Sequence, residues 1–328
     1  IITYKTYRMI HIPVLLNEVI EYLSPQPGQK FIDATIGGGG HALAILERIM
    51  PGGKLLGIEW DGELAKRLEA QIRHSQFKDG VILINDSYAN LERIAEDNDF
   101  KNAQGVIFDL GMSSWHLEES GGGFSFAKDE PLDMRYRDAN LRMYANAANE
   151  ENQLTAREII NRYSYDELVK ILKENGEEKF AKRIAEAIVR ARKEKPITTT
   201  FQLVEIIKNS IPFRYRRGRI PRRSASGTLR GRHFATKTFQ ALRIAVNDEL
   251  ENIKSGIGHA KNILAAGGRL AVISFHSLED RIVKNFFREE SKKENLKILT
   301  KKPVRAGLAE ITANPRARSA KLRVAEKL

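Results

Sequence analysis

The chain has 328 residues, of which 42% are hydrophobic and 29% are charged, values that are ordinary for a globular protein. It has no cysteine, which excludes disulfides, cysteine nucleophiles and cysteine-ligated zinc, and its seven histidines show no metal-binding spacing, so we predict no metal site. No apolar run approaches the roughly 18 to 20 residues of a membrane-spanning helix, and the net charge of +12 favours a polyanionic partner such as nucleic acid.

The N-terminal segment has no apolar core of the kind that signal peptides carry. Met9 is a candidate initiator, and the eight residues before it would then be upstream or vector-derived sequence. We therefore expect a cytoplasmic protein.

The first third of the chain alternates strand patterns with helix patterns. We predict strands at residues 30–35, 54–58, 81–84 and 105–108, and helices at residues 41–46, 63–73 and 87–97. Apolar strands that are separated by helices are typical of an α/β fold, in which helices cover both faces of a parallel sheet.

After Asp109 the pattern changes to a glycine-rich, loop-like stretch and then to helical periodicity without strands. The α/β pattern resumes with a predicted helix at 238–264, a strand at 269–274, a helix at 279–290 and a closing antiparallel pair at 296–299 and 320–324. We therefore predict a discontinuous sheet domain of residues 1–112 and 235–328. Residues 113–234 would form an inserted, mostly helical domain for substrate recognition.

Acidic residues and glycines gather at the predicted strand ends, where doubly wound sheets bind their ligands. Asp33, the glycines at 37–40, Glu59 and Asp109 follow successive strands. Glycines let the backbone approach a ligand, and the acid after the second strand can accept both ribose hydroxyls, so this pattern indicates a nucleoside-bearing cofactor. The loop lacks the GxxxxGK[ST] spacing of a nucleoside triphosphatase, but a nicotinamide cofactor remains an alternative on this pattern alone.

Eight sequence blocks, in a fixed order along the chain, resemble blocks of a known protein family. They are HIPVLL at 11–16, DATIGGGGH at 33–41, DLGMSS at 109–114, GFSF at 123–126, PLDMR at 131–135, TFQALRI at 238–244, SFHSLEDR at 274–281 and NPRARSAKLR at 314–323. Together they resemble the bacterial ribosomal RNA small-subunit methyltransferase H family. The resemblance covers nearly the whole chain, from residue 11 to residue 328.

The resemblance implies a class I methyltransferase (Rossmann-like) sheet with a helical insertion. It implies transfer of a methyl group from S-adenosylmethionine to the 4-amino group of a cytosine in 16S ribosomal RNA, near the decoding centre. The residues that would bind the cofactor are Gly39, Gly40, His41, Glu59, Tyr88, Asp109 and His116. Among them, Glu59 would hold the ribose hydroxyls and Tyr88 would lie against the adenine.

Several positions depart from the family pattern. Glu59 stands where aspartate is usual, which leaves Asp61 as a rival for the ribose, and Trp115 and His116 stand where proline and glutamine are common. Gly122 replaces a usual arginine and Phe234 a usual proline. These differences concern details of cofactor and RNA contact, whereas the reaction is unaffected.

The substrate side of the reaction requires a group that orients the cytosine amine. This amine is a poor nucleophile because its lone pair is delocalised, so the site must align it with the methyl group and accept its hydrogen bonds. Asp133 and His276 are the candidate catalytic residues on this side. Alternatively, both residues only hold loops in place, and the sequence identifies no general base.

The segment at 213–232 contains eight arginines and no acid, and Phe213 and Tyr215 lie among them. Arginine binds phosphates and stacks on bases, so the segment is a predicted RNA clamp, with the basic tail at 301–323 as a second candidate surface. The expected partner is 16S ribosomal RNA or the small ribosomal subunit, with the target base flipped out of any stack. The sequence leaves the oligomeric state open.

Three other functions remain as alternatives at this point. They are a methyltransferase of another RNA or of DNA, a nicotinamide-dependent oxidoreductase, and an RNA-binding assembly factor without catalytic activity.

Overall fold

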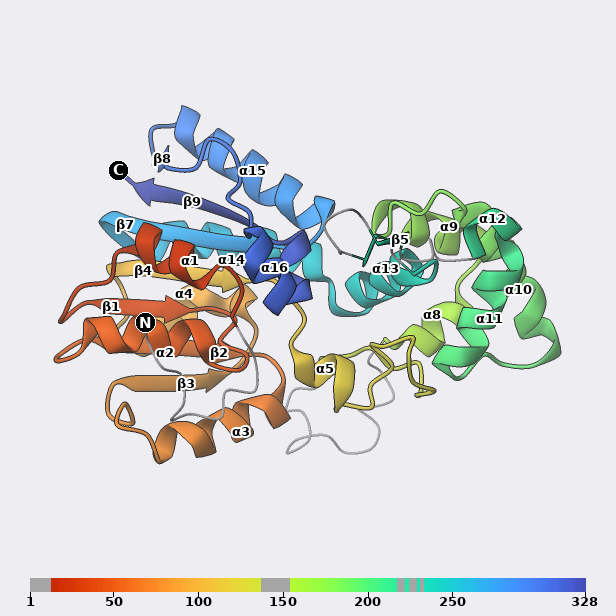
Figure 1. Ribbon diagram of the computed structural model, residues 1–328, viewed down its shortest axis with the longest axis horizontal. Helices are drawn as coiled ribbons and strands as arrows, with labels where there is room; N and C mark the ends of the chain where they lie inside the picture. The colour runs from red at the N-terminus through yellow and green to blue at the C-terminus, as the bar shows by residue number, and fades with distance from the viewer. Residues whose placement is uncertain (1–12, 137–153, 217–221, 224–228, 231–232) are drawn as a thin grey trace. The chain divides into compact units, whose positions relative to one another are not determined.

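The computed structural model describes residues 13–136, 154–216, 222–223, 229–230 and 233–328. Met9, the start of the 11–16 block and much of the arginine-rich segment lie outside these residues. The chain divides into two compact units (Figure 1). We call them the sheet unit, with described residues 13–113 and 250–328, and the helical unit, with described residues 114–136 and 154–249. The domain boundaries predicted at 112/113 and 234/235 stay a prediction.

The sheet unit is built on a seven-stranded sheet with the order β3-β2-β1-β4-β7-β9-β8. Neighbouring strands from β3 to β7 pair in parallel, whereas β9 pairs antiparallel with both β7 and β8. The strands are β1 (Lys30–Asp33), β2 (Lys54–Glu59), β3 (Val81–Asn85), β4 (Ala103–Asp109), β7 (Leu264–Ser274), β8 (Leu296–Ile298) and β9 (Lys321–Lys327). The predicted α/β fold and the antiparallel pairing of the last two strands are therefore confirmed.

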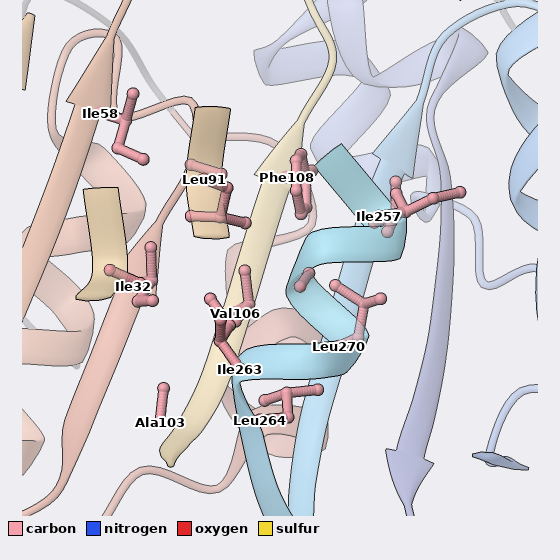
Figure 2. Packing of buried hydrophobic residues seen from close by; sticks show 14 of the residues in the cluster. Ile32, Ile58, Leu91, Ala103, Val106, Phe108, Ile257, Ile263, Leu264 and Leu270 are labelled. Carbon is pink, nitrogen blue, oxygen red and sulfur yellow. The ribbon is translucent and has the colours of Figure 1, made fainter. Parts of the chain in front are cut away.

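Helices cover both faces of this sheet, so its central strands are buried on both sides. One apolar cluster joins the sheet to α1 (Leu16–Leu23), α2 (Gly40–Ile49) and α3 (Gly62–Arg73). The other joins it to α4 (Leu91–Asp97), α14 (Glu249–Ile263) and α15 (Ser277–Lys292). Figure 2 shows Val106 and Phe108 of β4 in this second cluster, together with Ile257 and Ile263 of α14. Burial on both faces explains why the strands are continuous apolar runs and do not alternate.

The helical unit consists of short helices and one two-stranded ribbon. Its elements are α5 (Ser114–Glu118), α8 (Ala156–Arg162), α9 (Tyr165–Glu174), α10 (Ala181–Glu194), α11 (Thr200–Ser210), α12 (Phe213–Arg216), β5 (Arg222–Arg223), β6 (Leu229–Arg230) and α13 (Thr236–Asn247). Thr155 with Glu158, and Ser164 with Glu167, form capping boxes that start α8 and α9.

The predicted single helix at 238–264 is wrong, because the structure has two helices there. Asp248 adopts a left-handed conformation with φ of 49°, which ends α13 and separates it from α14. Aspartate tolerates this conformation better than most residues do. In addition, β7 starts at Leu264, earlier than the predicted strand at 269–274.

The remaining elements of the chain are short. They are the 3-10 turns η1 (Tyr88–Asn90) and η2 (Pro315–Ser319) and the helix α16 (Leu308–Ala313). Within the described residues, no helix combines the length and the apolar character needed to span a bilayer.

Candidate active site

The glycine loop after β1 leads into a helix whose first turn has no capping side chain. Gly37 and Gly39 have φ angles of 51° and 78°, which other residues adopt only with strain. At Gly40, a Cβ atom would lie 3.0 Å from the ring of Pro13. Gly39 is the N-cap of α2, and no side chain of the described chain caps this helix. The backbone N–H groups of its first turn can therefore bind an anionic group.

The carboxylate of Glu59 joins the end of β2 to the glycine loop. Its Oε2 accepts a hydrogen bond from the Gly37 N–H at 3.0 Å, and its Oε1 accepts one from the Asp61 N–H at 2.8 Å. The Asn85 side chain of β3 donates to the Glu59 carbonyl at 2.7 Å, which fixes the backbone from the other side. Glu59 is thus buried at the strand end with its carboxylate directed to the loop.

Asp61, the rival of Glu59, has a structural task. It is the N-cap of α3, where its Oδ1 accepts hydrogen bonds from the N–H groups of Glu63 and Leu64, both at 3.0 Å. Such a cap is worth about 1 kcal/mol to the helix. The capping geometry accounts for an acid at this position without a ligand.

Asp109 lies at the end of β4, beside the first turn of α2. Its Oδ2 is 3.7 Å from His41 Nδ1, its Oδ1 accepts a hydrogen bond from the Gly111 N–H, and its own N–H donates to Thr35 Oγ1 at 2.6 Å. The other ring nitrogen of His41 is 2.9 Å from the Val14 carbonyl oxygen. A carbonyl can only accept, so this nitrogen, Nε2, carries a proton and Nδ1 faces the Asp109 carboxyl group.

Buried acids give this edge of the sheet unusual electrostatics. The pKa of Asp33 is raised to about 8, mainly by burial; a hydrogen bond from the Thr35 N–H lowers it, and the nearby Asp109 and Glu59 carboxylates contribute to the increase. Burial also raises the pKa of Asp109, whereas His41 lowers it. Ionising both carboxyl groups in this low-dielectric site is unfavourable unless a positive charge compensates.

Tyr88 lies in η1, directly after β3. Its ring is half-buried and meets Phe108 of β4 edge to face, with 5.6 Å between the ring centres. Gly256 of α14 lies close to both rings, because a Cβ atom there would lie 2.8 Å from the Tyr88 ring and 3.1 Å from the Phe108 ring. Tyr88 is therefore held between sheet and helix.

The remaining predicted site residues have different surroundings. His116 belongs to the helical unit, where it packs against Phe124 and Tyr136 with ring-centre distances of 5.2 Å and 4.9 Å. Asp133 of the same unit is paired with Arg135 through two contacts of 2.6 Å and 3.0 Å. His276 of the sheet unit caps α15, with its Nε2 2.9 Å from Glu279 Oε1.

The structure therefore brings five of the seven predicted cofactor residues to the carboxyl edge of one sheet. They are Gly39, Gly40, His41, Glu59 and Asp109. Tyr88 follows β3, which is the neighbour of β2 in this sheet. Their contact with a cofactor stays a prediction. Sequence reasoning gave no individual role to Asp33 and did not single out Thr35 or Asn85. The position of Asp33 at a strand end was a signal for it, whereas the hydrogen bonds of Thr35 and Asn85 depend on strands that are distant in sequence.

Comparison with known proteins supplies the family. The sequence profile of the MraW methylase family matches residues 8–328. The chain belongs to the MraW methylase family.

Curated relatives match this chain over nearly the whole length of both proteins. Ribosomal RNA small subunit methyltransferase H of Persephonella marina is 45% identical over 318 residues, which cover 97% of this chain and 99% of the relative. Proteins of the same name from Heliobacterium mobile and Halothermothrix orenii are each 42% identical, over 97% of this chain and 99% and 98% of the relatives.

Membership of the MraW family confirms three sequence predictions. The chain is a methyltransferase, its cofactor is S-adenosylmethionine, and its sheet, with antiparallel β9 between β7 and β8, is the class I methyltransferase sheet. The nicotinamide-dependent oxidoreductase is thereby ruled out as an alternative.

Proposed function

We propose that this protein methylates the 4-amino group of a cytosine in 16S ribosomal RNA, near the decoding centre, in the cytoplasm. Its relatives are named for the small-subunit RNA, and the net charge of +12 suits a polyanionic substrate. The observation that carries the proposal is the group of buried acids and uncapped helix N–H groups at one sheet edge. The helical unit and the arginine-rich segment at 213–232 would recognise the RNA.

The residues of this edge fit S-adenosylmethionine. The uncapped first turn of α2, beginning at Gly40 and His41, offers N–H groups to the carboxylate of the methionine part, whereas the Gly39 N–H donates to the Ile36 carbonyl at 2.7 Å. Glu59, whose carboxylate lies at the strand end beside the glycine loop, would accept hydrogen bonds from the ribose hydroxyls. Tyr88 offers a ring edge or face to the adenine.

The cofactor, when bound, supplies an electrophilic methyl group on a positively charged sulfur. The raised pKa values of Asp33 and Asp109 match this charge, because a nearby cation favours their ionised forms. The task of the protein is then to exclude water and to hold the cytosine amine in line with the methyl group. Asp133 and His276 would contact the cytosine at this step, and His116 would contact the cofactor. Each of the three also has a structural partner of its own.

The test is methyl transfer from radiolabelled S-adenosylmethionine to small subunits that lack the modification. We expect transfer by the wild type and a loss for Asp109→Ala, whose removed charge-assisted hydrogen bonds are worth about 1.5 to 3 kcal/mol of cofactor binding. Calorimetry with S-adenosylmethionine, S-adenosylhomocysteine and NADH should detect the first two only. Asp79→Ala, which removes an exposed acid, is the matched control.

RNA binding without methyl transfer would instead identify an assembly factor. Transfer to DNA or to another RNA, with none to the small subunit, would contradict the substrate assignment. Unchanged cofactor affinity in Asp109→Ala would remove Asp109 from the site.

A further inference from the structure

Three aromatic rings lie together on the helical unit, and we call them the aromatic stack. Phe126, the last residue of the GFSF block, stacks on His233, with 4.3 Å between the ring centres and 10° between the ring planes. The ring centre of His233 is in turn 4.1 Å from that of Phe234, with the planes tilted by 33°. All three residues are partly exposed. The proposed cofactor and catalytic residues include none of them.

Contacts within the helical unit hold the stack in place. Phe239 of α13 is buried and meets Phe126 edge to face, with 5.7 Å between the ring centres. The Ala235 N–H donates a hydrogen bond to His233 Nδ1 at 3.3 Å, so in the neutral ring the proton is on Nε2. Burial lowers the pKa of His233, which keeps the ring uncharged at neutral pH. The stack is therefore an ordered and uncharged surface.

Phe234 occupies a turn position that does not require an aromatic ring. The Thr236 N–H donates to the His233 carbonyl at 3.1 Å, which closes a β-turn with Phe234 as its second residue. Ala235, the third residue, has φ of −80° and ψ of −14°, close to the values of a type I turn. Proline is the favoured second residue of such a turn. The Phe234 ring thus needs a reason other than the backbone, and its partial exposure leaves surface for a ligand.

The aromatic stack follows directly on the arginine-rich segment. Arg230 of β6 and Arg232 precede His233 by three positions and one position, and the segment at 213–232 contains no acid. Three residues of chain reach no further than roughly 10 Å, so the backbone of β6 ends close to the stack. Because β5 pairs with β6, Arg222 lies opposite Arg230 on this ribbon. Arginines from two parts of the segment are therefore brought near the rings.

Rings beside arginines suit a single strand of RNA. Unpaired bases stack on aromatic faces, and arginines bind the phosphates of the same strand, which is the combination that proteins use to hold single-stranded nucleic acid. A duplex would present its phosphates but keep its bases stacked inside. An acidic peptide would satisfy the arginines, but its carboxylates would gain nothing from uncharged rings.

We infer that the aromatic stack binds an unpaired base of the RNA substrate, while the neighbouring arginines hold phosphates of the same strand. This inference rests on the proposed function, because it concerns the same RNA. It gives the helical unit a contact to a base in addition to the phosphate contacts of the arginine-rich segment. Because every base has a flat face, the contact secures the strand and does not select its sequence.

The first test compares the wild type with F234P, which removes the ring and keeps the turn. The measurement is binding of a single-stranded fragment of 16S ribosomal RNA to the cofactor-free protein at several salt concentrations. We expect F234P to bind about tenfold more weakly, as is usual when one stacked base loses its aromatic partner. The slope of log affinity against log salt should not change, because no phosphate contact is lost.

Two further variants complete this comparison. F234W keeps an aromatic face and should bind RNA as the wild type does. F201A removes another phenylalanine of the helical unit, one that is 45% exposed on α11, and should also keep the wild-type affinity. Thermal unfolding followed by circular dichroism checks that all variants are folded, and F234P should lose no stability, since proline suits its turn.

The second test detects the stacking itself. The fluorescent base 2-aminopurine, whose emission falls when it stacks on an aromatic ring, replaces each unpaired base of the fragment in turn. We expect one position to be quenched by the wild type and by F234W, and not by F234P.

Wild-type affinity of F234P for the RNA would overturn the inference. So would a shallower salt slope of F234P, because the loss would then come from displaced arginines. Normal binding of RNA by F234P together with weaker binding of whole subunits would also overturn it, since a ribosomal protein would then be the partner of the stack. Methyl transfer by the wild type tests the proposed function separately. If the wild type transfers no methyl group to small subunits, the proposed function fails whatever the fluorescence shows.

Discussion

Two acids, Glu59 and Asp61, lie two positions apart at the end of β2 and have different tasks. The Glu59 carboxylate faces the glycine loop, whereas Asp61 caps α3. We predict that Glu59→Gln weakens S-adenosylmethionine and S-adenosylhomocysteine equally, because both carry the same ribose. Asp61→Asn should change neither affinity, since asparagine caps a helix as well as aspartate does. Calorimetry on both variants checks this, and the reverse pattern would make Asp61 the ribose acid.

The pKa of Asp33 predicts a pH-dependent stability. Burial raises it to about 8 from an ordinary value of 3.8, so between these values the folded state holds a proton that the unfolded state has lost. The free energy of unfolding therefore decreases as the pH rises through this window, by up to about 1.4 kcal/mol per pH unit. Asp33→Asn should remove this contribution.

Urea unfolding of the cofactor-free protein at pH 5 and pH 8 measures the effect. The variant should gain stability relative to the wild type as the pH rises, while the Thr35 N–H keeps an acceptor in the asparagine oxygen. A constant difference between the two proteins would mean that Asp33 is ionised throughout this range.

Among the elements, the strands were predictable and the helix break was not. Apolar runs such as 105–108 of β4 identify strands that are buried on both faces. The break at Asp248 has no proline, and the glycines of α14, at 256 and 258, lie inside the helix that follows. The local sequence pattern cannot show which residue adopts the left-handed backbone conformation, because several residues of the segment could adopt it. The predicted strand ends located the acids of the site, but the hydrogen bonds between strands required the sheet order.

The arginine-rich segment is an element with a testable task in RNA binding. Within its described part, Lys179 lies 3.6 Å above the ring of Tyr215, and β5 pairs with β6. We predict that replacing Arg216, Arg217, Arg222 and Arg223 with glutamine makes the salt slope of RNA binding shallower by up to about 3 units. Cofactor affinity should not change, because the proposed cofactor residues are elsewhere in the chain.

A matched control for this segment replaces four exposed lysines of the helical unit, at 170, 173, 193 and 195. It lowers the net charge equally without touching the arginines. If the arginine variant keeps the wild-type slope and methylation rate, the segment is only a solvated loop. The basic tail at 301–323 would then be the principal candidate for the RNA surface.

On the scale of the whole molecule, the sheet unit is discontinuous in sequence, because the described residues of the helical unit lie between its two parts. Strand β4 pairs with β7, for example Gly105 with Arg269, across the residues that form the helical unit. We predict that a fragment of residues 114–249 resists proteolysis and shows a cooperative thermal transition, whereas residues 1–113 alone do not. Circular dichroism and limited proteolysis of the two fragments check this. A stably folded 1–113 fragment would show that the sheet does not need β7 and β9.

This discontinuity has a consequence for folding while the ribosome synthesises the chain. When residue 249 has left the exit tunnel, the helical unit can be complete, but β4 still lacks its neighbour, and its apolar edge is open to pairing with another chain. The contacts that close this edge are distant in sequence and form slowly. We therefore expect the nascent chain to be most exposed to aggregation between the synthesis of β4 and that of β7.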